Sequence, residues 1–143
     1  LVVEEIAAWL DPALTVQQRL MALLHDAPEY VIGDMISPFK AALGLDYRAF
    51  ENRLEAAIHI RFGLPAKPSA PLKGLLKQSD LICAWFEATQ LAGFTIAEAE
   101  GLFVSPPPGL ALTLEPLAPQ DAQDAYLARF AALMAAHDRG AGV

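Results

Sequence analysis

The residues best suited to chemistry lie in one short segment, His25-Asp26-Ala27-Pro28-Glu29. If this segment is helical, His25, Asp26 and Glu29 stand three or four residues apart and project toward one side. Adjacent His and Asp supply an imidazole nitrogen and a carboxylate oxygen, which suit a borderline or hard divalent cation. Glu29, one turn further on, is placed to act as a general acid or base. By itself, such a turn is more often a solvated helix face than a site.

A distant carboxylate strengthens the metal interpretation. Asp80 falls in a predicted long helix, where Leu72 and Leu76 at helical spacing place it on a mostly apolar stripe. A carboxylate on such a stripe requires a cation or hydrogen-bond donors. An ion pair with Lys73 or Lys77 and a bound metal both meet this requirement, so both alternatives stay open.

The elements that must position these residues are all helical. Apolar residues recur at helical spacing in five segments, which are residues 1–10, 16–33, 46–62, 71–91 and 119–137. Shorter helices are expected after Ser37-Pro38 and after Thr95, and the proline-containing stretch 105–119 is expected to be a surface loop. With no convincing strand, the prediction is an all-α fold: an irregular multi-helix bundle in one domain, residues 1–143.

Local signals set the predicted helix limits. Thr15 is a suitable cap for the second helix, and Pro28 inside that helix lacks the N–H that would bind the carbonyl of Leu24, so the helix is expected to kink or loosen there. No capping residue precedes Leu1, and the sequence does not start with Met, so we expect the first helix to begin upstream. In helix 46–62, the stripe expected to be buried comprises Tyr47, Phe50, Leu54, Ile58 and Phe62.

Composition narrows the possible partners. The chain has 143 residues with 10 basic and 17 acidic side chains, a net charge of −7, which argues against a nucleic-acid polymer as partner. No apolar run approaches the roughly 20 residues of a membrane span, so no membrane partner is expected. One cysteine, Cys83, rules out an intrachain disulfide framework. With no signal peptide visible, a cytoplasmic location is the expectation.

The block HDAPEYVIGD, followed by SPFK and by Asp80 within a long helix, resembles the HD-domain superfamily of metal-dependent phosphohydrolases. Within it, the chain is most similar to the small bacterial branch that includes 5′-deoxyribonucleotidases. The resemblance runs from Val2 to about Phe103 and is most specific from His25 to Lys40. It implies an HD-domain-like helical bundle that tends to pair as a homodimer.

The resemblance also implies roles for individual residues. His25, Asp26 and Asp80 would be ligands of one divalent metal ion (Mn, Co, Mg, Zn, Fe or Ni), and Glu29 the catalytic acid or base. The family pattern has a further His on an earlier helix, which this chain lacks and which we expect upstream of Leu1.

Two more residues match the family block. Asp34 would lie in the catalytic pocket near water or substrate. Lys40 would approach the phosphate, although a plain surface position is an equal alternative for it.

The function implied by the resemblance is hydrolysis of a nucleoside monophosphate or another small phosphorylated metabolite by a metal-activated water. A different class remains open, in which a non-catalytic domain keeps the fold and binds or senses a nucleotide. A third, weaker alternative is a helical oligomerisation module that makes contacts through residues 104–119.

The other reactive side chains are predicted to be structural. His59 is expected to be a hydrogen-bonded histidine near Glu55, and Cys83 a buried thiol. Three further groups complete this set: Trp85 and Phe86 in the core, His137 at a helix end, and Arg61 and Lys67 on a solvated face, where they could steer an anionic ligand.

Overall fold

The computed structural model describes residues 1–33, 42 and 45–140 of the chain. The helices in this part are α1 (Val2–Leu10), α2 (Val16–Leu23), α3 (Glu29–Ile32), α5 (Leu45–Arg61), α6 (Ala70–Gln90), α7 (Ile96–Glu100) and α8 (Pro119–Gly140). No strand occurs among the described residues. The prediction of an all-α, multi-helix fold is therefore confirmed.

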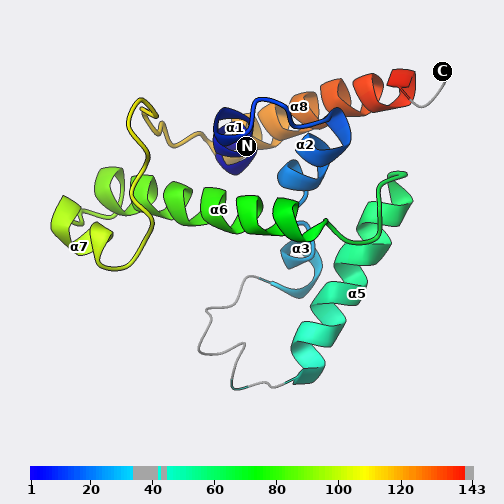
Figure 1. Ribbon diagram of the computed structural model, residues 1–143, viewed down its shortest axis with the longest axis horizontal. Helices are drawn as coiled ribbons and strands as arrows, with labels where there is room; N and C mark the ends of the chain where they lie inside the picture. Colours follow the sequence, from blue (N-terminus) through cyan, green and yellow to red (C-terminus); the bar gives the residue numbers. More distant parts are fainter. Residues whose placement is uncertain (34–41, 43–44, 141–143) are drawn as a thin grey trace.

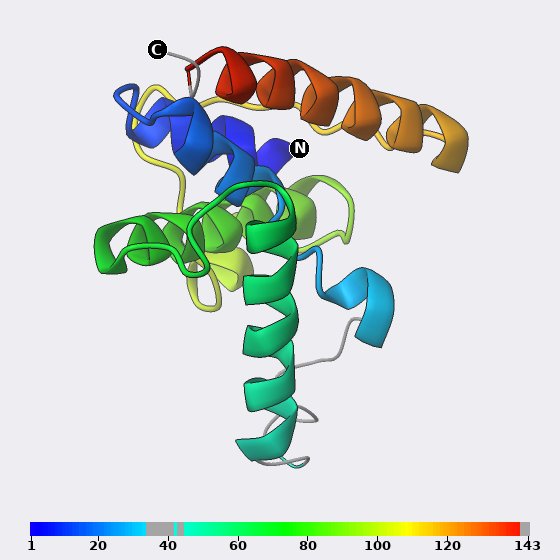
Figure 2. The ribbon, with the colours of Figure 1, turned by 90° about the vertical axis from the view of Figure 1, so that its right-hand side faces the viewer.

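Helices α1 and α2 form the middle of the molecule, with α6 on one side and α8 on the other (Figure 1, Figure 2). Helix α1 contacts both α2 and α6, and α2 contacts α8. Helix α5 points away from this group, as Figure 2 shows most clearly. The short helix α3 lies beside α5 (Figure 1, Figure 2).

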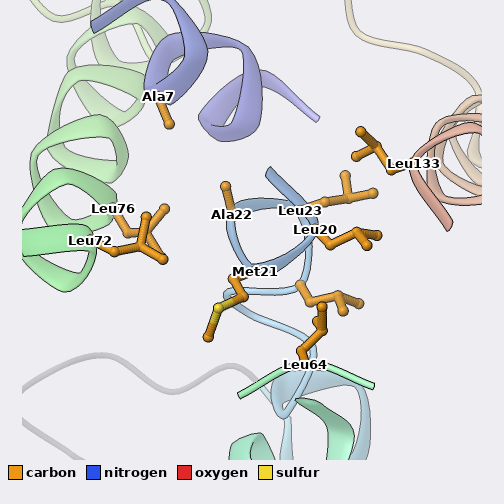
Figure 3. Packing of buried hydrophobic residues seen from close by; sticks show 10 residues of the cluster. Ala7, Leu20, Met21, Ala22, Leu23, Leu64, Leu72, Leu76 and Leu133 are labelled. Carbon is orange, nitrogen blue, oxygen red and sulfur yellow. The ribbon is translucent and has the colours of Figure 1, made fainter. Parts of the chain in front are cut away.

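The main core is built around α2. Leu20 and Leu23 of this helix are buried, with Leu72 and Leu76 of α6 to one side and Leu133 of α8 to the other (Figure 3). Burying such a leucine contributes about 1.5–3 kcal/mol relative to leaving it exposed. This cluster fixes the end of α2, and with it the segment that follows.

A second core joins α1 to α6. It contains Ile6 from α1, Ile82, Cys83 and Phe86 from α6, and Leu110 from the long connection before α8. This packing agrees with the prediction of a buried thiol at Cys83 and a core position for Phe86. A third expected core residue, Trp85, is partly buried against the same cluster.

A buried ion-pair network ties three helices together. Glu4 of α1 is only 3% exposed. Its Oε1 accepts a hydrogen bond from Nε of Arg19 at 2.5 Å. Arg129 of α8 binds both carboxylate oxygens, through Nε at 3.0 Å and through its terminal nitrogen at 2.8 Å. Paired in this way, the buried charge is neutralised and links α1 to α2 and α8.

The helix starts that were predicted at Thr15 and Thr95 are confirmed, because both residues act as caps. Thr15 and Gln18 form a reciprocal capping box at the start of α2, and Thr95 and Glu98 form another at the start of α7. Ser69 caps α6 through Leu72 N, and no helix forms in residues 101–118.

Two predictions about helices are only partly correct. The helix predicted over 16–33 does loosen near Pro28, but it is interrupted there, because α2 ends at Leu23 and α3 begins only at Glu29. The expected buried stripe of α5 is only half-buried at Tyr47, Leu54, Ile58 and Phe62, and it fails at Phe50, which is 45% exposed, while His59 is 1% exposed. Within the described residues, the C-terminal end of α5 is the end that lies at the central helices, and the rest of the helix extends away from them (Figure 2).

His59 also differs from its expectation. Neither of its ring nitrogens has a hydrogen-bond partner in the described part of the chain. The prediction of a hydrogen-bonded histidine is therefore wrong: His59 is buried without a hydrogen bond to either ring nitrogen. Among the helices that the structure describes, none is long and apolar enough to cross a bilayer.

Candidate functional site

The site begins where α2 stops. Leu24 N still donates to the carbonyl of Leu20, but the carbonyl of Leu24 accepts from Ala27 N at 2.9 Å. In a regular helix it would accept from residue 28, which is Pro28 and has no N–H. The chain therefore tightens into turns over residues 24–28 before α3 starts. His25 and Asp26 stand in this turn, not on a helix face as predicted.

The turn decides which way the His25 ring points. Its Nδ1 lies 2.9 Å from the carbonyl oxygen of Ala22. A carbonyl can only accept, so Nδ1 carries the proton and Nε2 holds the lone pair in the neutral ring. Metal-binding histidines are usually held by such a bond from the other ring nitrogen. The His25 ring is thus oriented as in a metal-binding histidine, with Nδ1 bound to a carbonyl and Nε2 available as the ligand atom.

The free end of the ring meets a carboxylate. Nε2 of His25 lies 2.8 Å from Oδ2 of Asp26. Nε2 is buried and has no in-line hydrogen bond within the described residues. Burial on its own would lower the pKa of His25, but the hydrogen-bonding contact and charge of Asp26, the Ala22 carbonyl and the charge of Asp80 outweigh it and raise the pKa. The local field therefore favours a cation at this point.

A cavity of about 490 Å³ opens next to this pair. Its walls come from the turn after α2, from α3, α5 and α6, and from the connection before α6. The lining residues are His25, Asp26, Pro28, Glu29, Glu51, Asn52, Glu55, Lys67, Pro68, Lys73, Leu76, Lys77 and Asp80. The four described residues that the sequence singled out, His25, Asp26, Glu29 and Asp80, thus face one cavity. The other two, Asp34 and Lys40, lie outside the described residues.

Asp80 does not sit on an apolar stripe as expected. Its side chain is 40% exposed, and Oδ2 accepts from Nζ of Lys77 at 2.8 Å. Successive steps of four residues rotate about 40° around a helix, so Asp80 is turned about 80° from Leu72. That rotation carries it from the core side to the cavity. Of the two alternatives for Asp80, an ion pair with lysine or a bound metal, the structure contains the ion pair, with Lys77.

Three lysines in the cavity were not predicted as site residues. Lys67 had been assigned to a solvated face with possible steering of an anion, and it lines the cavity together with Lys73 and Lys77. Their spacing in the sequence could have indicated this position for two of them, because Lys73, Lys77 and Asp80 lie on one face of α6. From α5, Glu51 and Glu55 also line the cavity and were missed.

The donor set of this cavity supplies only part of a site for a divalent cation. No group of three or more His, Cys, Asp or Glu side chains in ligand geometry occurs within residues 1–33, 42 and 45–140. His25 and Asp26 nevertheless fit two positions of such a site, because a buried imidazole nitrogen and a carboxylate oxygen converge at 2.8 Å. Asp80 faces the same cavity, and its charge acts on His25.

A second, apolar cavity of about 600 Å³ borders the same turn. It shares His25 and Asp26 with the first and is otherwise lined by Leu1, Leu23, Leu24, Ala27, Tyr30, Val31, Ile58, Phe62 and Tyr126. The hydroxyl of Tyr126 donates to the carbonyl of Leu23 at 3.2 Å, which fastens α8 to the end of α2.

Fold and site together define an all-α domain with a polar cavity of mixed charge beside a His-Asp pair. No family model matches the chain. It is 49% identical over 138 residues to an uncharacterized protein of Rhodobacter capsulatus, an overlap that covers 94% of this chain and 69% of that protein. It is 33% identical over 112 residues to the uncharacterized protein YfdR of Escherichia coli, covering 76% of this chain and 58% of YfdR. The chain belongs to the family of the Rhodobacter capsulatus protein.

Proposed function

We propose that the chain is a metal-dependent phosphohydrolase of the HD type, acting on a nucleoside monophosphate or a similar small phosphoester. The observation that carries the proposal is the composition of one cavity. It combines the His25-Asp26 pair, Glu29 and Asp80 with the three ammonium groups of Lys67, Lys73 and Lys77. Ligands for a cation and groups for a phosphate anion are thus available in the same space.

His25, Asp26 and Asp80 would hold the metal. His25 is prepared for this role by the bond from Nδ1 to Ala22, which leaves Nε2 directed at Asp26. When bound, a divalent cation lowers the pKa of a water molecule and polarises a phosphoryl oxygen. The contribution of the chain is to place two ligands side by side on a turn that the main core holds in position.

Glu29 would move the proton. It starts α3 directly after the turn, and its side chain lines the cavity that the His25-Asp26 pair faces. A carboxylate in that place can take a proton from the attacking water and return it to the leaving oxygen. Asp34 and Lys40 stay predictions from the family resemblance.

The lysines would bind the phosphate. Lys73 and Lys77 stand one turn apart on α6, and Lys67 approaches from the connection before that helix. Ammonium groups around a phosphoryl group hold it and neutralise charge that develops during transfer. The opposite wall, with Asn52 and Glu55 of α5, offers hydrogen-bond acceptors to hydroxyl or amino groups of a substrate.

A second candidate is a non-catalytic domain that binds or senses a nucleotide. The observation in its favour is the Lys77-Asp80 ion pair, because a carboxylate that stays neutralised by lysine would not hold a metal. A homodimer and a cytoplasmic location also stay predictions.

The two candidates differ in turnover. Full-length protein would be stripped with a chelator, reloaded with Mn²⁺, Co²⁺ or Mg²⁺, and assayed for phosphate release from nucleoside monophosphates and sugar phosphates. Metal-dependent release supports the hydrolase. Nucleotide binding in calorimetry without release from any substrate, with every metal, would contradict the hydrolase and favour the sensing domain.

A further inference from the structure

We infer that the substrate of the polar cavity is a small phosphoester whose alcohol part carries a protonated amine. Lys67 and Lys73 bind its phosphate, and Glu55 with Asn52 binds the amine. The inference rests on the proposed function for the phosphate end and adds the chemical class of the alcohol part. It concerns side chains of the chain alone and requires no bound metal.

Two lysines of the cavity have no ion-pair partner among the described residues. Lys67 lies in the connection before α6 and Lys73 in the first turn of that helix, and both line the cavity with exposed side chains. Lys77, by contrast, is already paired with Asp80. Ammonium groups make charge-assisted hydrogen bonds to the oxygens of a phosphate monoester. The phosphate end of a ligand is therefore expected at Lys67 and Lys73.

One carboxylate of α5 lacks a partner in the same way. Glu55 lines the cavity and is half-buried, and within the part of the chain that the structure describes it takes part in no ion pair. Asn52 also lines the cavity and lies three residues earlier, on the same face of α5. Partial burial raises the cost of an unpaired carboxylate, and a cationic or hydrogen-bond-donating group of a ligand removes that cost.

The unpaired positive and negative groups come from different elements. Glu55 belongs to α5, whereas Lys73 belongs to α6, and the connection 62–69 joins the two helices (Figure 1). All of them line one cavity of about 490 Å³, a size common for small-molecule sites, yet Glu55 pairs with neither Lys67 nor Lys73. A ligand can satisfy both sides only if it has an anionic end and a donor end.

The charge balance of the cavity favours an amine over a hydroxyl at the donor end. Among the described lining residues, five carboxylates stand against three lysines, so a phosphate dianion with no positive group is repelled by the excess. A protonated amine lowers the net negative charge of the ligand. It also makes charge-assisted hydrogen bonds to a carboxylate, which are stronger than those of a neutral hydroxyl.

The experiment uses full-length protein and phosphonates, whose carbon–phosphorus bond a phosphoester hydrolase does not cleave. Aminoalkylphosphonates with two to six carbons are compared by calorimetry at pH 7.5 with hydroxyalkylphosphonates of the same length. Titrations are run with a chelator and again with Mg²⁺. We expect the amino compound to bind about three- to tenfold more tightly than its hydroxyl counterpart at the chain length that spans the cavity, as for a partly exposed ion pair.

Three variants test which side chains cause this preference. Glu55→Gln keeps the size of the side chain, removes its charge and should bring the affinity ratio of the two ligands close to one. Lys73→Met should weaken both ligands and leave the ratio within about twofold of wild type, whereas a general effect of cavity charge would raise the ratio. Glu100→Gln, at an exposed position at the end of α7, should keep the wild-type ratio.

The outcomes separate the inference from the proposed function. A ratio near one in wild type at every chain length, or no binding of either series in either condition, overturns the inference, while metal-dependent phosphate release is measured independently. A preference that persists in Glu55→Gln overturns the role of Glu55. A clear amine preference in a protein that releases phosphate from no phosphoester would overturn the hydrolase and keep the ligand class.

Discussion

Nδ1 of His25 lies 2.9 Å from the carbonyl oxygen of Ala22, one turn back along the chain. Because this bond favours the proton on Nδ1, the lone pair of the neutral ring is on Nε2, which lies 2.8 Å from Oδ2 of Asp26. Two groups that both carry a lone pair approach this closely only with a cation to share, whether a proton or a metal ion.

Removal of either member of the pair should abolish metal binding. Outer-sphere partners of metal ligands are worth about 10–100-fold in affinity, so we expect His25→Gln and Asp26→Asn each to weaken Mn²⁺ binding by at least about 100-fold. The free-Mn²⁺ resonance signal measures this. Asp138→Asn, an exposed position near the end of α8, is the control for loss of one negative charge, and equal weakening in it would contradict the assignment.

Glu29→Gln should separate chemistry from binding. Loss of a general acid or base costs about 10²–10⁴-fold in rate, while the metal ligands remain. We expect Mn²⁺ affinity close to wild type and kcat reduced by about that factor. A variant with full turnover would remove Glu29 from the mechanism. The matched control is Glu55→Gln, on the opposite wall of the cavity, which should retain far more of kcat.

The Cys83 thiol should be inert in the folded protein. Burial first, then the charge of Glu87 and the Sγ contact to its carboxylate at 3.7 Å, raise the pKa of Cys83 to about 12. Since it is the only cysteine, a disulfide-exchange reagent at pH 8 reports on it alone. We expect slow reaction in the native state and fast, stoichiometric reaction in denaturant. Equally fast reaction in both would contradict the buried position.

The same pKa predicts how stability depends on pH. An unfolded cysteine has a pKa of about 8.5, so the folded state holds the thiol proton more tightly. This contribution is fully present below about pH 8.5 and is lost as pH rises toward 12. Denaturant titrations of Cys83→Ala should therefore show a shallower loss of stability between pH 9 and pH 11 than those of wild type.

The Glu4 network should contribute measurably to stability. Arg129→Met removes two charge-assisted hydrogen bonds from a carboxylate that is 3% exposed. We expect the free energy of unfolding to fall by about 1–3 kcal/mol. Arg139→Met, on the exposed last turn of α8, should stay within about 0.5 kcal/mol of wild type. Equal effects in urea titrations of the two variants would contradict a structural role for the network.

Much of the fold followed from local signals in the sequence. Thr15 and Thr95 act within three residues of themselves, so the starts of α2 and α7 were predictable. Pro28 indicated a weakness in the second helix, but its missing N–H affects the chain four residues earlier, at Leu24. The break therefore comes before His25 instead of at the proline, and periodicity alone does not reveal that shift.

Tertiary context decided the remaining differences. Helix α5 points away from the central helices (Figure 2), so an apolar residue such as Phe50 stays 45% exposed while His59 is buried. The side of α6 on which Asp80 lies differs from that of Leu72, because each step of four residues rotates around the helix axis. That this side borders a cavity depends on how α6 packs against the other helices. The sequence brought His25, Asp26, Glu29 and Asp80 together as candidates, whereas the place of Lys67, Lys73 and Lys77 in the same cavity depends on how α6 and the connection before it pack against the turn after α2.

The most direct test of the central proposal combines metal content and turnover in one preparation. Wild-type protein and Asp26→Asn would be loaded with Mn²⁺, freed of excess metal, and assayed for bound Mn²⁺ and for phosphate release from the best substrate in the panel. We predict about one Mn²⁺ per chain and steady phosphate release in wild type, with both lost in Asp26→Asn and release in wild type stopped by a chelator. Phosphate release that continues in Asp26→Asn, or in chelated wild type, would contradict the account.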